Sequence, residues 1–110
     1  MCADVQLSPS DGQVDQAVQT LAMLAEPTRI RLLWAMLDGE RAVHELASVV
    51  GSSPTSVSQH LAKLHLTGLV RRRREGRRVL YAADDVHVRR LLQEALYHAD
   101  HALQDHADHA

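Results

Sequence analysis

The chain has 110 residues, of which 45% are hydrophobic and 24% charged, and this composition predicts one globular domain over residues 1–110. Its one cysteine, Cys2, excludes an internal disulfide, and no apolar run is long enough to cross a membrane. We therefore expect a cytoplasmic protein with no membrane partner. Phe is absent, so the core must be built from Leu, Val and Ala around Trp34. Such a composition favours helices, and a small leucine core often gains burial by dimerising.

Two helices are predicted in the first third of the chain. Residues 1–10 show no periodicity and are expected to be mobile, whereas apolar residues recur at helical spacing between residues 14 and 24. The segment "EPTRIRLLWAML" then begins a second helix, with Pro27 in its first turn and Asp38-Gly39 at its end. Its buried stripe is expected to contain Ile30, Leu33, Trp34 and Leu37.

A helix-turn-helix is predicted in the middle of the chain. The segment "VHELASVV" is a short helix closed by Gly51. The next helix, over residues 55–67, has Ser53 as its N-cap and Pro54 at its start, and Gly68 ends it. Its inward face is expected to contain Val57, Leu61 and Leu64.

A basic hairpin and a long helix complete the predicted order. The segment "LVRRRREGRRVLYA" predicts two short strands around Glu75-Gly76, with Val79 and Tyr81 alternating. Asp84 or Asp85 then begins a helix with an apolar residue at every third or fourth position. The predicted fold is mainly α with a β-hairpin wing (α+β), a winged helix-turn-helix in the order ααααββα.

The charge distribution predicts that this middle part binds nucleic acid. The net charge is only −2, yet residues 56–78 contain seven basic residues and one acid. Six arginines on one hairpin repel one another unless something such as a phosphate backbone neutralises them, and polar side chains near a recognition helix start reach base edges. An amphipathic surface helix and a solvated hairpin are the alternatives. The predicted DNA contacts are Ser53, Thr55, Ser56, Ser58, Gln59, His60, Lys63, Arg71, Arg73, Arg77 and Arg78.

Four segments, "EPTRIRLL", "ELA", "SVSQHLAKL" and "GLV", together resemble the ArsR/SmtB family of metal-sensing winged-helix regulators. The similarity extends over about residues 14–101. It implies a homodimer whose first and last helices form the interface, with the winged motif on operator double-stranded DNA. No glycine-rich phosphate loop or nucleophile–base pair indicates an enzyme with a small-molecule substrate. Family sensors with thiolate sites carry cysteines near the helix before the turn, and "VHELASVV" has none, which excludes such a site.

The last helix carries a D-x-H-x10-H-x2-H pattern, formed by Asp85, His87, His98 and His101. His98 and His101 are neighbours on one helix face, but His87 lies roughly 16 Å from His98 along a helix. One ion cannot span that distance, whereas two antiparallel helices of a dimer could form two equivalent sites. The pattern is similar to the family's C-terminal-helix site for zinc, cobalt or nickel. Histidines that only solvate the dimer seam are the alternative.

The chain ends in a repeat, "HADHALQDHADHA", whose last part is a His- and Asp-rich tail over about residues 103–110. Three imidazoles and a carboxylate suit Zn(II), whereas further ligands from His106 or His109 favour Ni(II) or Co(II), the ions we expect. His106 lies about 12 Å beyond His98 and would have to fold back. A disordered tail that binds metal weakly is the alternative. Cys2 could add an amine and a thiolate, or be an inert exposed thiol.

The resulting prediction is a regulator whose operator affinity changes when Ni(II), Co(II) or Zn(II) bridges its C-terminal helices. In the family the metal usually weakens DNA binding, but the sequence does not determine that sign. Two other functions fit the sequence: a metal-independent winged-helix regulator that works with a partner protein, and a cytosolic metal buffer or chaperone. His44 and His65 are expected to be core, surface or phosphate contacts rather than ligands.

Overall fold

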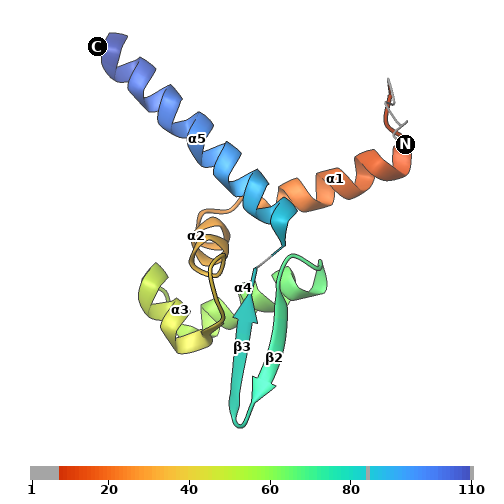
Figure 1. Ribbon diagram of the computed structural model, residues 1–110, viewed down its shortest axis with the longest axis vertical. Coiled ribbons are helices and arrows are strands. Elements are labelled where there is room, and N and C mark those ends of the chain that lie inside the picture. The colour runs from red at the N-terminus through yellow and green to blue at the C-terminus, as the bar shows by residue number, and fades with distance from the viewer. Residues whose placement is uncertain (1–7, 84, 110) are drawn as a thin grey trace.

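The computed structural model describes residues 8–83 and 85–109, with only the backbone described for residues 106–109. In these residues five helices and three strands follow one another: α1 (Asp11–Leu24), α2 (Pro27–Ala35), β1 (Arg41–Ala42), α3 (Val43–Val50), α4 (Pro54–Leu66), β2 (Arg71–Glu75), β3 (Arg78–Ala82) and α5 (Val86–His109). Helices α2, α3 and α4 and the hairpin form the body, from which α1 and α5 extend as two arms (Figure 1). The predicted class, mainly α with a β-hairpin wing, is confirmed.

Local capping chemistry sets where the helices begin and end. Pro27 takes the first position of α2, and the Glu26 carboxylate accepts a hydrogen bond of 2.8 Å from a backbone N–H of the first turn. Ser53 caps α4 in the same way, accepting from the N–H of Ser56 at 3.1 Å. Gly51 closes α3 with a φ of 69°, a left-handed conformation that favours glycine. The predicted helix-turn-helix is therefore confirmed.

The hairpin belongs to a three-stranded antiparallel sheet with the strand order β1-β3-β2. The sequence does not predict strand β1, because two residues show no alternating pattern and the strand is defined by its pairing with β3. Glu75 pairs with Arg78, so the turn consists of Gly76 and Arg77. The predicted turn at Glu75-Gly76 is therefore one residue out of register.

The core is built from leucine-rich faces of α2, α3 and α4, as the composition predicts. Seven of its side chains have no exposed surface: Leu32, Leu33, Met36, Leu46, Val57, Leu61 and Leu64. The prediction that Trp34 anchors the core is wrong, because Trp34 is 48% exposed. Helix α2 ends at Ala35, before the predicted Asp38-Gly39, and it turns Leu32 and Leu33 inward, which leaves Trp34 on its other side.

Only the beginning of α5 packs against the body. Val88 and Leu92 are buried, and the guanidinium of Arg89 donates hydrogen bonds of 2.7 Å to the Leu37 carbonyl and 2.8 Å to the Asp38 carboxylate. The side chains of residues 93–105 are all exposed. Most of α5 is therefore available to another molecule. In the described part of the chain, no helix is both long enough and apolar enough to span a membrane.

We predict that Leu64→Ala lowers the free energy of unfolding by about 2–5 kcal/mol, because it leaves a cavity in the core. Leu66→Ala, two residues later on the same helix, is the matched control. Leu66 is 86% exposed, so its truncation changes stability by less than about 0.5 kcal/mol. Urea denaturation at one protein concentration measures both variants, and equal losses would contradict this assignment of the core.

Candidate functional site

The exposed side of α4 carries polar side chains near its N-terminal end. Four of them are exposed and make no side-chain hydrogen bond to another described residue: Thr55, Ser58, Gln59 and Lys63. The Ser53 hydroxyl is occupied as the helix cap, and Ser56 is half-buried. The opposite side of α4 is in the core. The helix therefore presents a polar surface that its own chain leaves open to a ligand.

His60, which is predicted from the sequence to contact DNA, turns toward α2. Its Nδ1 accepts a hydrogen bond of 3.2 Å from Nε of Arg29 and lies 3.8 Å from the Glu26 carboxylate. The same guanidinium donates to the backbone oxygen of Met23 at 3.4 Å and to its Sδ at 3.1 Å. Arg29 thus joins α1, α2 and α4. His60 belongs to this joint rather than to the open polar surface of α4.

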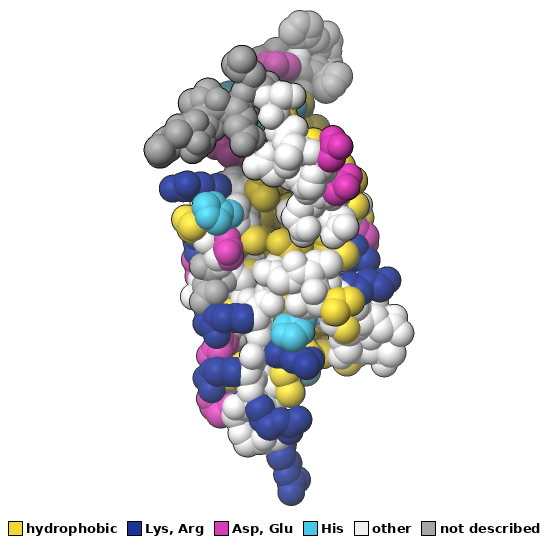
Figure 2. Space-filling model, turned by 90° about the vertical axis from the view of Figure 1, so that its right-hand side faces the viewer, with side chains coloured by type: hydrophobic (Ala, Val, Ile, Leu, Met, Phe, Trp, Pro, Cys, Tyr) yellow, Lys and Arg dark blue, Asp and Glu magenta, His cyan; other side chains and the backbone are white. Residues whose placement is uncertain are grey.

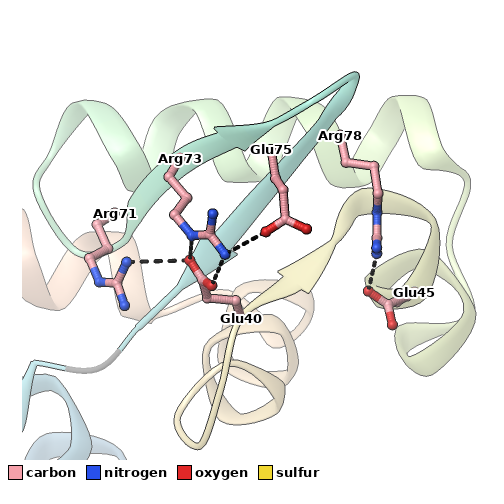
Figure 3. A network of polar contacts seen from close by, with 6 residues as sticks. All are labelled: Glu40, Glu45, Arg71, Arg73, Glu75 and Arg78. Atoms are coloured by element: carbon pink, nitrogen blue, oxygen red, sulfur yellow. Dashed lines mark hydrogen bonds and ion pairs between the residues drawn. The ribbon is translucent and has the colours of Figure 1, made fainter.

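Glu40, in the loop between α2 and β1, binds two arginines of the hairpin (Figure 3). Arg73 forms a two-pronged pair with it, with Nε–Oε2 and Nη2–Oε1 distances of 2.7 and 2.8 Å. The same Nη2 lies 2.8 Å from a carboxylate oxygen of Glu75. Nη1 of Arg71 lies 3.5 Å from Glu40 Oε2. Carboxylates of the chain itself therefore neutralise part of the arginine charge that is predicted from the sequence to bind DNA.

Glu45 holds a third arginine of the hairpin. Its Oε1 lies 3.3 Å from Nη2 of Arg78 and also accepts a hydrogen bond of 2.8 Å from the backbone N–H of Ala42. Sequence reasoning missed both Glu40 and Glu45. Each pairs with an arginine 33 residues away in the sequence, and no local pattern encodes such a contact. Acidic residues that precede a basic hairpin are the only hint, and a weak one.

The pairing with Arg73 affects the ionisation of Glu40. Hydrogen bonds from the Arg73 guanidinium hold the pKa of the Glu40 carboxyl below its ordinary value of 4.5, although partial desolvation acts in the opposite direction. The same bonds to Glu40, and then those to Glu75, raise the pKa of Arg73. The pair is therefore fully charged at neutral pH.

The other three arginines of the hairpin, Arg72, Arg74 and Arg77, are exposed and form no ion pair with another described residue. Figure 2 shows Lys and Arg side chains over the lower half of one face, down to the tip where Figure 1 places the turn of the hairpin. A cavity of about 320 Å³ lies beside them, lined by Arg72, Arg73, Arg74, Val79 and Tyr81. The hairpin therefore has a basic side that no described carboxylate neutralises.

Helices α1 and α5 carry exposed apolar side chains. On α1, Val14, Val18 and Leu21 are spaced by four and three residues, which places them on one helix face. On α5, the exposed apolar residues include Leu96, Tyr97 and Leu103. A groove of about 700 Å³ between α2 and α5 is lined mostly by apolar side chains, among them Ile30, Trp34 and Leu96. Apolar surface of this extent is typical of protein interfaces.

The four predicted metal ligands form two separate pairs, one at the start of α5 and one farther along it. Oδ1 of Asp85 accepts hydrogen bonds from the backbone N–H groups of His87 at 2.7 Å and Val88 at 3.2 Å, and so caps the helix. His98 and His101 lie one turn apart, and the His101 ring stacks on Tyr97 with 4.5 Å between the ring centroids. Within residues 8–83 and 85–105, no three His, Cys, Asp or Glu side chains lie together as a metal site would require. The described part of one chain therefore does not form the site.

The additional candidate ligands fall at the ends of the chain. Helix α5 continues to His109 without a break, so His106 is not folded back toward His98, as it would have to be to share an ion with it. The side chains of His106 and His109, and all of Cys2, lie outside the described residues. Residues 1–7 also lie outside, but Ser10 caps α1, so the predicted mobile segment does not reach residue 10.

A helix-turn-helix followed by a basic two-stranded wing defines the class of winged helix-turn-helix regulators of transcription. The chain belongs to the ArsR/SmtB family, since its residues 26–72 match the family described as "Bacterial regulatory protein, arsR family" and it has a close relative in that family. The resemblance seen in the sequence is thereby confirmed. Its relatives are regulators of transcription and not enzymes.

Relatives and solved structures extend this similarity over most of the chain. KmtR from Mycobacterium tuberculosis (strain ATCC 25618 / H37Rv), an HTH-type transcriptional regulator, is 47% identical over 92 residues, which cover 84% of this chain and 71% of KmtR. The homodimeric winged helix-turn-helix DNA-binding domain of Mb0332 from Mycobacterium bovis has a TM-score of 0.77 at 33% identity, covering 91% of this chain and 95% of that one. The antimony-specific transcriptional repressor AntR has a TM-score of 0.81 at 32% identity, covering 94% and 93%.

We predict that Arg73→Gln raises the pKa of the Glu40 carboxyl toward its ordinary value of 4.5, because the substitution removes the bidentate pair. Arg72→Gln is the control, since it removes the same charge from the neighbouring residue but breaks no contact with Glu40. NMR titration of the side-chain carboxyl carbon measures the pKa in both variants. An equal shift in the two would show that the Arg73–Glu40 bonds are not its cause.

The direction of this pKa shift also predicts how stability depends on pH. A carboxyl whose pKa is lower in the folded state stabilises that state above its unfolded pKa, near 4.5, and the contribution is lost as the pH falls through the folded value. Glu40→Gln has no such contribution to lose. We therefore expect acidification below about pH 4.5 to destabilise the variant less than the wild type, as followed by urea denaturation. Parallel stability curves would contradict this expectation.

Proposed function

We propose that the protein is a metal-responsive regulator of transcription in the cytoplasm. It acts as a homodimer that binds operator double-stranded DNA and holds Ni(II) or Co(II), with Zn(II) as the alternative, between its two α5 helices. The observation that carries this proposal is that Asp85 and His87 at the start of α5 are kept apart, within one chain, from His98 and His101 on the exposed part of that helix. In this proposal residues 1–110 act as one domain.

The exposed apolar surfaces support the homodimer. Val18 and Leu21 on α1, and Leu96 and Tyr97 on α5, lie on the two arms that extend from the body (Figure 1). A second copy that covers these arms and the groove at Trp34 would remove apolar area from water, at about 25 cal/mol per Å². The described homodimer of Mb0332 has the same fold over most of this chain, which supports the same assembly here.

The open polar side of α4 supports DNA binding. A homodimer presents two such helices, which suits successive major grooves about 34–36 Å apart. In this proposal the exposed side chains of Thr55, Ser58 and Gln59 contact base edges, and that of Lys63 contacts a phosphate. The N–H groups at the start of α4, beside Ser53 and half-buried Ser56, also favour a phosphate. His60 is not part of this set, because Arg29 engages it.

The donor atoms on α5 fit a first-row transition metal. Imidazole nitrogens and carboxylate oxygens are ligands that Ni(II), Co(II) and Zn(II) accept. His87, His98 and His101 are exposed, and both backbone hydrogen bonds to Asp85 are made by Oδ1, so the described residues leave Oδ2 available as a ligand. Two antiparallel α5 helices bring Asp85 and His87 of one chain to the other two ligands of its partner. When bound, the ion bridges the subunits and so favours one arrangement of the dimer.

The attachment of α5 connects that arrangement to DNA binding. Val88, Leu92 and Arg89 fasten the beginning of each α5 to the body that carries α4 and the wing. A change in how the two α5 helices cross therefore changes the spacing of the two recognition helices. Couplings of this kind are typically about 1–3 kcal/mol, or roughly 5–150-fold in affinity, and they are reciprocal. AntR, named as an antimony-specific repressor, supports regulation by an inorganic ion in this fold.

We predict that the wild-type dimer binds Ni(II) or Co(II) at one ion per chain and that His98→Ala abolishes this binding, as measured by isothermal titration calorimetry. His44→Ala is the control, because His44 is exposed on α3 and lies outside the proposed site. Metal is also expected to change the affinity for operator DNA roughly 5–150-fold in the wild type and not in His98→Ala. A DNA affinity that does not change with metal would favour the metal-independent regulator. Metal binding without DNA binding would favour the metal buffer or chaperone.

A mixing experiment tests whether the site is shared between two chains. His87→Ala and His98→Ala each break both sites of their own homodimer, but a mixed dimer keeps one intact site, with His87 from one chain and His98 from the other. We therefore expect each variant alone to bind no metal. Their equal mixture, after subunit exchange, regains about one quarter of the wild-type sites, since half of the dimers are mixed and each has one of two sites. No recovery in a mixture shown to contain mixed dimers would exclude a site between chains.

A further inference from the structure

The six arginines of the hairpin fall into two groups that differ in their contacts. The paired arginines are those bound by carboxylates of this chain: Arg71, Arg73 and Arg78. The open arginines are those with no ion pair to a described residue: Arg72, Arg74 and Arg77. We propose that the open arginines bind the phosphates of operator DNA, whereas the paired arginines hold the wing in place. This assignment rests on the proposed function, because it presupposes that the protein binds DNA.

The register of the hairpin separates the two groups. Arg72 is opposite Tyr81 and Arg74 is opposite Val79, so these four side chains share one face of the sheet. Tyr81 belongs to the hydrophobic core, which also contains residues of α4, and Val79 packs against that core. Arg72 and Arg74 therefore lie on the face of the sheet that also carries core side chains.

The paired arginines of β2 lie on the other face. Arg73 is opposite Leu80, and its side chain points to Glu40 and Glu75 (Figure 3). Two of its nitrogens, Nε and Nη2, donate at 2.7–2.8 Å to carboxylate oxygens. A phosphate that approached this face would have to displace those bonds and would meet the charges of Glu40 and Glu75. The gain of a new charge-assisted hydrogen bond would be offset by the loss of the old ones.

The open arginines carry no such penalty. Arg72 and Arg74 are exposed beside a cavity of about 320 Å³, and no acidic residue lines that cavity. Arg77 is in the turn at the end of the hairpin that is farthest from the arms, at the bottom of Figure 1. The three positive charges are therefore neutralised by no described partner, and a DNA backbone beside the recognition helix supplies the counter-charge. Of the set predicted from the sequence, Arg77 stays, and Arg72 and Arg74 replace Arg71, Arg73 and Arg78.

The salt dependence of DNA binding tests this assignment. Each phosphate contact contributes about 0.9 to the slope of log K against log salt concentration, so losing one contact in each wing of a dimer lowers the slope by about 1.8. We expect this decrease for Arg72→Gln and for Arg74→Gln. Arg73→Gln removes the same charge between these two positions and is expected to keep the wild-type slope. The probe is a duplex that the wild-type protein selects from a random-sequence pool.

A second control covers the case in which Arg73→Gln fails to fold. Arg78→Gln breaks a single contact of 3.3 Å on the surface and is also expected to keep the wild-type slope. The assignment is overturned if a paired-arginine variant that folds, as judged by circular dichroism, loses as much slope as Arg72→Gln. It is also overturned if Arg72→Gln and Arg74→Gln keep the wild-type slope. A wild-type protein that selects no duplex would instead refute the proposed function itself.

Discussion

The structure attaches α5 to the body only at its beginning, and the roles proposed for the other parts depend on that constraint. Val88, Leu92 and Arg89 hold the first turns, and the side chains of residues 93–105 are exposed. A helix rises about 1.5 Å per residue, so His87 and His98 are roughly 16 Å apart along its axis. No change of side-chain rotamer closes such a gap. An ion that uses both ligand pairs must therefore recruit a second chain, which makes metal binding and dimer geometry one event.

Each arm is connected to α4 or to the wing through one intervening segment of the body. Arg89 of α5 binds the loop of residues 37–40, and Glu40 at the end of that loop holds Arg73 of the wing. On the other side, Arg29 bonds to the last turns of α1 and to His60 of the recognition helix. Networks of such hydrogen bonds switch between discrete arrangements and do not deform continuously. In the proposed homodimer, a rearrangement of the arms would thus act on α4 and on the wing through short, separate connections.

Local chemistry is what made the fold predictable, and packing is what limited the prediction. Pro27, Ser53 and Gly51 act on backbone groups within a few residues, so the starts of α2 and α4 and the end of α3 could be predicted from sequence alone, whereas the end of α2 could not. Whether a side chain points into the core depends on what packs against its helix or strand. The exposure of Trp34 therefore could not be predicted from the sequence. The hairpin shows this most clearly, since the turn lies one residue from its predicted place. Residues on a strand alternate between faces, and the register decides which arginines meet Glu40.

The division of the arginines also explains how a chain with a net charge of −2 can bind a polyanion. Electrostatic interactions between exposed charges are screened within about 8–10 Å at physiological ionic strength, so DNA responds to the surface it touches and not to the total. Glu40, Glu45 and Glu75 act on the face of the paired arginines, opposite the face that carries Arg72 and Arg74. There they hold the hairpin in place before DNA arrives. A wing that is already ordered loses less conformational entropy on binding. The carboxylates lower the total positive charge of the hairpin, but by ordering the wing they strengthen the binding of phosphates by the arginines that remain unpaired.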